Sequence, residues 1–152
     1  MVGAVSYNIE NDKEFKVFLE KVSKISTSRF VMGEAARIIK KFSKANFILK
    51  GSGKYPPLSE RYKRRKQRIR PNRPILVFNG RLRDSIVGNT KDSILHIKDD
   101  SLIVGTATPY AIYLDQGTDN MPARKPLFLT KKMIEQIMKV YDAHIDKRLR
   151  NI

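Results

Sequence analysis

The chain has 152 residues, about the length of one domain over residues 1–152, and with 41% hydrophobic residues it can bury an apolar core. It has no cysteine and only two histidines, His96 and His144, which excludes disulfides, thiolate zinc sites and cysteine nucleophiles and argues against a multi-histidine metal centre. Apolar runs such as residues 75–78 are far shorter than the ~20 residues of a transmembrane helix, so we expect no membrane partner.

Positive charge is concentrated in one stretch of the chain. The sequence has 31 Lys and Arg against 15 Asp and Glu, a formal net charge of +16. Residues 50–73 hold ten Lys or Arg and one Glu, whereas residues 84–120 are net negative, with six Asp and two Lys. A balance of this kind predicts a polyanionic or acidic partner without naming it.

Two amphipathic helices, or one bent helix, are predicted across residues 11–47. Apolar residues recur at helical spacing over residues 15–25 and again over residues 31–45, with charged residues between them. Ser26-Thr27-Ser28 interrupts the pattern.

Residues 49–74 are predicted to form an extended basic arm outside the core. Residues 59–68 favour one short helix but have almost no apolar face, and Pro71 and Pro74 end it.

A small antiparallel sheet is predicted after the arm. Residues 93–98 alternate in polarity and residues 101–106 follow a tight acidic turn at Asp99-Asp100, which predicts a hairpin. Residues 75–78 are expected to be a short buried element, and residues 81–86 either a helical turn or the entry to a strand.

The last third of the chain predicts two helices. Pro109 favours a short helix over residues 110–116 that Gly117 ends, and residues 121–126 are irregular. Apolar residues from Leu127 onward predict a long closing helix. We therefore expect an α+β fold, with a small antiparallel sheet packed against N-terminal helices and a long C-terminal helix.

Five further positions are interpreted structurally. Gly105 is expected at a strand bulge, and three aromatic residues of the last third, Tyr110, Tyr113 and Phe128, are expected in the core together with Leu114.

No catalytic constellation emerges from these residues. A hydrolase triad of Ser85, His96 and Asp115 fails, because no nucleophile elbow surrounds Ser85 and His96 lies mid-strand, where we expect it to face solvent. His144 is expected on the surface of the last helix. We predict no catalytic, cofactor or metal site.

Several separated strings occur in a fixed order. They are Arg29-Phe30, residues 53–59 (GKYPPLS), residues 75–86 (ILVFNGRLRDSI), residues 104–106 (VGT), residues 109–118 (PYAIYLDQGT) and residues 121–128 (MPARKPLF). Together, over roughly residues 29–130, they resemble the tailed-bacteriophage virion-morphogenesis family, also called the tail-completion or Mu G-like family. Tyr55 stands where many members have Trp, and residues 125–127 interrupt the family's compact Ala-Arg-Pro-Phe motif.

The resemblance implies a non-enzymatic structural protein of the virion at the head–tail junction, assembled in the host cytoplasm. Such subunits form rings that complete the tail or neck so that the tail joins the DNA-filled head. It implies partners of two kinds: copies of the same chain, six by analogy with tail symmetry or twelve on the portal side, and neighbouring connector, tail-terminator or tail-tube proteins.

The basic arm has two interpretations. It either docks on an acidic neighbour, for which the aspartates of residues 84–120 offer a surface on an identical copy, or it contacts genomic DNA non-specifically. The alternative function is a stand-alone nucleic-acid-binding protein that uses residues 61–73. Only Tyr62 accompanies the basic run, so base stacking is not expected.

Loops that a rigid scaffold holds commonly contact partners, so residues 115–125 are expected at the subunit boundary. The predicted interface residues are Arg61, Lys63, Arg64, Arg65, Lys66, Arg68, Arg70, Asp115, Gln116, Thr118 and Arg124.

Overall fold

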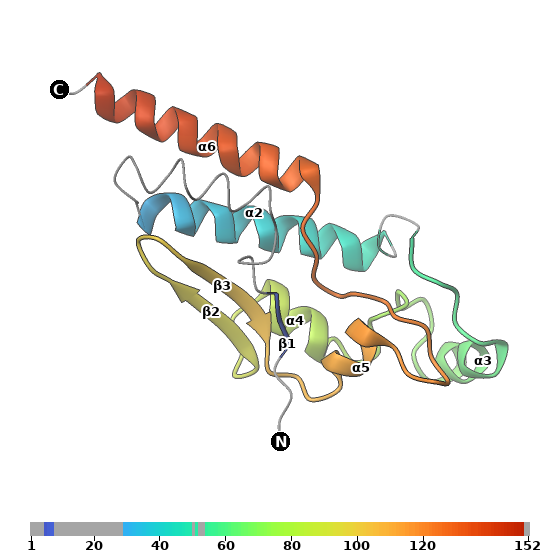
Figure 1. The fold of residues 1–152 in the computed structure, drawn as a ribbon. Coiled ribbons are helices and arrows are strands. Elements are labelled where there is room, and N and C mark those ends of the chain that lie inside the picture. Colours follow the sequence, from blue (N-terminus) through green and yellow to red (C-terminus); the bar gives the residue numbers. More distant parts are fainter. Residues whose placement is uncertain (1–4, 8–28, 50, 52–53, 151–152) are drawn as a thin grey trace.

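A computed structural model describes residues 5–7, 29–49, 51 and 54–150 of the chain (Figure 1). Its elements are β1 (Val5–Tyr7), α2 (Arg29–Ile48), α3 (Glu60–Ile69), α4 (Arg81–Val87), β2 (Ser93–Ile97), β3 (Leu102–Thr106), α5 (Ala111–Gln116) and α6 (Lys131–Leu149). The second half of the predicted N-terminal helical region is thus confirmed as α2, and the part before residue 29 lies outside the described residues.

The sheet is antiparallel, with strand order β1-β3-β2. The predicted hairpin is confirmed, and its turn is closed by the Lys98 N–H, which donates to the Ser101 carbonyl at 2.9 Å. β1 was not predicted; it pairs with the other side of β3. Gly105 pairs in regular register with Ile94, so the predicted bulge at Gly105 is wrong.

The core surrounds α2, which lies between α6 and the sheet in Figure 1 and contacts both. The inward residues of β3, Leu102 and Val104, complete this core together with α4, which packs on α2 and on both hairpin strands. The α+β class, with its small antiparallel sheet and long C-terminal helix, is confirmed.

One boundary and the burial of one segment differ from the sequence prediction. α6 begins at Lys131 and not at Leu127, because Thr130 caps it: the Thr130 hydroxyl accepts from the Met133 N–H at 3.3 Å. The predicted buried element at residues 75–78 is only partly buried, since Val77 is fully buried but Phe78 is 38% exposed.

The predicted basic helix is confirmed as α3, which lies at one end of the molecule in Figure 1. Ser59 caps it by accepting from the Tyr62 N–H at 3.4 Å. Within the described ranges, no helix combines the length and apolar character needed to cross a bilayer.

Candidate functional site

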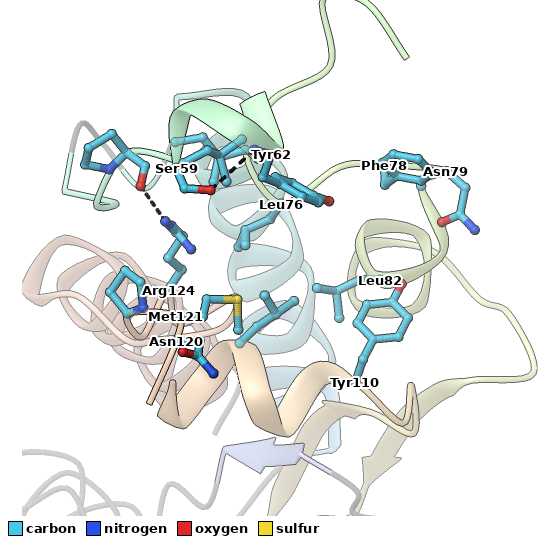
Figure 2. Close-up of a pocket in the computed structure, with 16 residues that line it drawn as sticks. Ser59, Tyr62, Leu76, Phe78, Asn79, Leu82, Tyr110, Asn120, Met121 and Arg124 are labelled. Carbon is cyan, nitrogen blue, oxygen red and sulfur yellow. Dashed lines mark hydrogen bonds between the residues drawn. The ribbon is translucent and has the colours of Figure 1, made fainter. Parts of the chain in front are cut away.

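An apolar groove of about 490 Å³ lies between α3, the loop before α4, and α5. Its walls come from four stretches of chain that are far apart in the sequence: residues 57–62, 75–82, 110–114 and 120–124. Figure 2 shows the side chains of Tyr62, Leu76, Leu82 and Met121 converging on the same space from different elements. The fold therefore builds one surface from segments that the sequence separates.

Two glycines shape the chain around this groove. Gly80 precedes α4 with φ 94° and Gly117 ends α5 with φ 78°, a region of backbone conformation that other residues rarely adopt. A Cβ on Gly117 would lie 2.8 Å from the backbone nitrogen of Ala123. The short helix and the residues 120–124 wall can therefore approach closely only with glycine at this position.

Exposed aromatic side chains line the groove. Tyr62, Phe78 and Tyr110 are 42%, 38% and 39% exposed. The prediction that Tyr110 and Tyr113 belong to the core is wrong, because they are 39% and 58% exposed; of the six residues of α5, which follows Tyr110, only Ala111 is fully buried. Exposed tyrosine beside methionine is typical of protein–protein interfaces. The separated strings that occur in a fixed order contain Phe78 and Tyr110, but these side chains were predicted to lie in the core.

Arg124 is buried beneath the groove and does not face outward. It is 3% exposed, its Nε donates to the Pro56 carbonyl at 2.7 Å, and its Nη2 donates to the Pro57 carbonyl at 2.6 Å. Burial lowers the pKa of the guanidinium. The predicted contact of Arg124 with a partner is therefore corrected: its donors join the arm to the residues 121–126 loop within one chain.

The predicted contact of Lys66 with a partner is also corrected. Lys66 is 4% exposed, and its ammonium donates to the carbonyls of Pro74 and Ile75, the latter at 2.9 Å. Burial lowers the pKa of the ammonium. Because these carbonyls lie beyond the end of α3, Lys66 fixes the helix to the chain that follows it and is not available to a partner.

The other predicted interface residues of the arm are exposed. Four arginines, Arg61, Arg64, Arg65 and Arg68, line a shallow hollow of about 530 Å³ on the outer face of α3. Lys63 lies 3.6 Å from Glu60, and Arg70 follows the helix. Of the predicted loop residues, Gln116 and Thr118 are exposed, Asp115 is half-buried, and the Thr118 N–H donates to the Met121 carbonyl at 2.8 Å.

The acidic segment does not form an acidic face. Arg81 binds Asp92 with both Nε (2.6 Å) and Nη2 (3.1 Å), and this hydrogen bond and charge lower the pKa of Asp92. Arg83 contacts Asp84 at 2.7 Å. The hairpin aspartates, Asp99 and Asp100, line one hollow together with Arg29 and Lys98. Among the described residues, no ion pair involves the remaining two, Asp115 and Asp119.

Ser85 and His96 of the rejected triad lie in different environments, one buried and the other exposed. The Ser85 hydroxyl is buried, donates to the Leu82 carbonyl at 2.8 Å and lies 2.6 Å from the Thr106 hydroxyl. His96 is exposed on β2, as predicted. The described part of the chain holds no group of three or more residues able to ligate a metal ion.

His144 was expected on the surface of the last helix, and the structure shows it half-buried there. Its ring stacks on Phe30 of α2, with centroids 5.2 Å apart and planes 23° apart, and its Nε2 is buried. The polar side of α6 is therefore interrupted at His144 by a contact with α2.

Searches of protein-family models, of curated proteins and of solved structures each gave no match to this chain. The resemblance to the tail-completion family therefore stays a prediction based on the ordered strings.

Proposed function

We propose that this protein is a structural subunit of the phage virion at the head–tail junction, where copies of the chain form a ring that lets the tail join the head. The observation that carries the proposal is the convergence of the ordered strings: residues 57–59, 75–82, 110–114 and 121–124, all within them, line one exposed groove. A role in assembly needs such a docking surface and no reactive group.

We propose a second copy of this chain as the occupant of the groove. At the other end of the molecule the hairpin presents Ile103, which is 43% exposed, and β2 has no strand on its outer side among the described residues. The hairpin turn lies beside Arg29, at the start of α2, whereas the arm follows its end at Ile48. The hairpin turn and the arm thus lie at opposite ends of a helix of 20 residues, about 30 Å long (Figure 1).

Complementary surfaces at opposite ends of a subunit produce head-to-tail association, which closes into a ring when the rotation between subunits allows it. Six copies are the expected number, twelve the alternative, and the ring would lie between connector and tail proteins in the virion.

Light scattering on the purified chain tests the ring. We expect the wild type to have the mass of a closed ring, and Phe78→Asp, which places a charge at the groove, to abolish it. The matched control is Met138→Asp, which changes an apolar residue of equal exposure (39%) on α6 and should leave the ring intact.

A mixing experiment tests the head-to-tail arrangement. Ile103→Asp should also abolish the ring, and a mixture of Phe78→Asp with Ile103→Asp should yield dimers and no larger species, because only one intact interface remains. A monomeric wild type at every concentration, absence of the chain from purified virions, or a ring that survives Phe78→Asp would contradict the proposal.

A further inference from the structure

We infer that the outer face of α3 is a binding site for the phosphate backbone of double-stranded DNA, with no preference for sequence. This inference goes beyond the proposed function, because the groove and hairpin assigned to ring formation do not include the four arginines of this face.

The arrangement of the four arginines favours this ligand. Arg61, Arg64, Arg65 and Arg68 have the spacing i, i+3, i+4 and i+7, so they share one side of α3 over about 10 Å. They line a single hollow, and no ion pair among the described residues neutralises any of them. A guanidinium matches phosphate by two parallel hydrogen bonds, which a lysine cannot make.

The opposite side of the helix holds this face in position. Tyr62 and Lys66 lie about 110° and about 150° around the helix from the centre of the arginine face. Tyr62 lines the groove, and Lys66 is bound to the carbonyls of Pro74 and Ile75. With the Ser59 cap, these contacts fix the helix before it meets a ligand. The arginines therefore project from an anchored helix and not from a free arm.

The charges of the chain favour a nucleic acid over a second copy as the ligand. Asp84 and Asp92 are already paired with arginines of their own chain, and the hairpin aspartates share their hollow with two cations. Within the part of the chain that the structure describes, these aspartates therefore do not offer a strongly acidic face to the four arginines. The phosphate backbone of a duplex offers one negative charge per ~1.7 Å of axis.

The absence of aromatic residues from this face favours a duplex over a single strand. Tyr62 is the one aromatic residue of α3, and it faces the groove. Single-strand binding sites stack bases on aromatic side chains, so this helix is suited to the backbone and not to the bases.

Salt-dependent binding tests the inference. The probe is a short fluorescein-labelled DNA duplex in two unrelated sequences, titrated with the full chain at increasing salt and followed by anisotropy. We expect both sequences to bind equally. The variant with Arg61, Arg64, Arg65 and Arg68 all changed to Gln should lose about 3–4 from the slope of log K against log salt, since each phosphate contact contributes about 0.9.

The control removes the same charge elsewhere. Lys131, Lys132, Lys139 and Lys147 are exposed on α6, and changing these four to Gln should alter the slope by less than about 1. An equal loss in this control would mean that only net charge matters, and would overturn the inference, as would an unchanged slope in the arginine variant.

Light scattering on the same samples separates the two proposals. A ring that persists in the arginine variant while DNA binding falls supports the inference. Loss of the ring with the DNA slope unchanged would assign this face to protein docking and overturn it. Circular dichroism monitors folding, and the double variants Arg61→Gln/Arg65→Gln and Arg64→Gln/Arg68→Gln replace the quadruple variant if that chain does not fold.

Discussion

Eight residues of α2 are buried, among them Val31, Met32 and Ile39 at 2% exposure or less, whereas α3 has a single buried residue, and that residue is a lysine. α2 packs on α6, α4 and the sheet. α3 is held by hydrogen bonds to loop carbonyls, with Lys66 as donor, and the loop before it is held by Tyr55 and Arg124.

This difference separates two tasks within one small chain. Apolar burial around α2 supplies non-directional stability, so a loss of buried apolar surface there destabilises the whole fold. Directional hydrogen bonds at the α3 end fix the orientation of a polar helix that has too little apolar surface to pack by itself. Two of the three proposed contact surfaces, the groove and the arginine face, belong to this second end, and the hairpin lies at the other.

The largest expected effect is in the core. Phe47 of α2 is 2% exposed, and Phe47→Ala should destabilise the fold by about 3–5 kcal/mol through lost burial and the cavity that remains. Urea unfolding followed by circular dichroism measures this. The exposed neighbour Ile48, at 61%, provides the control, and Ile48→Ala should cost much less. Equal effects of the two changes would contradict the central position of α2.

A smaller and local effect is expected at the α3 end. Arg124→Ala removes both donors to the Pro56 and Pro57 carbonyls and should cost about 1.5–3 kcal/mol, the range for hydrogen bonds to charged groups. Hydrogen exchange measured by mass spectrometry should accelerate over residues 54–70 more than over residues 131–147. Lys125→Ala, which removes an exposed charge next in sequence, should change neither segment. Uniform acceleration across the chain would show that the two ends are not separable.

The smallest effect concerns Tyr55, whose hydroxyl donates to the Lys125 carbonyl at 2.5 Å. Tyr55→Phe should cost about 0.5–1.5 kcal/mol near neutral pH. Burial raises the pKa of Tyr55 to about 12 from a usual 10, so the neutral form is favoured in the folded state. The contribution of Tyr55 is therefore complete below pH ~10 and is lost as pH rises toward ~12.

Urea midpoints of the wild type and Tyr55→Phe, measured near pH 8 and near pH 11, test the direction of this pH dependence. The advantage of the wild type should shrink at the higher pH, and the other tyrosines, common to both chains, cancel. An advantage that grows with pH would contradict the burial of the neutral hydroxyl.

Elements with a local signal were predicted well. The hairpin was indicated by alternation around Asp99-Asp100, α5 by Pro109 and Gly117, and α3 by a run of helix-forming residues between prolines. β1 was missed, because its three residues are a strand only through their pairing with β3. Tyr110 and Phe78 were assigned to the interior because they are apolar, although their exposure depends on which short elements surround them.

The sequence by itself determined the α+β class, the order of most of the elements and the position of the basic arm, since periodicity, turn residues and charge runs act over a few neighbouring residues. Only the tertiary structure decided which cations face outward. Lys66 is buried because the carbonyls of Pro74 and Ile75 accept from it, and Arg124 because carbonyls 67 and 68 residues away in the chain do so. A buried cation needs acceptors in place, and where those acceptors lie is a property of the folded chain and not of local composition.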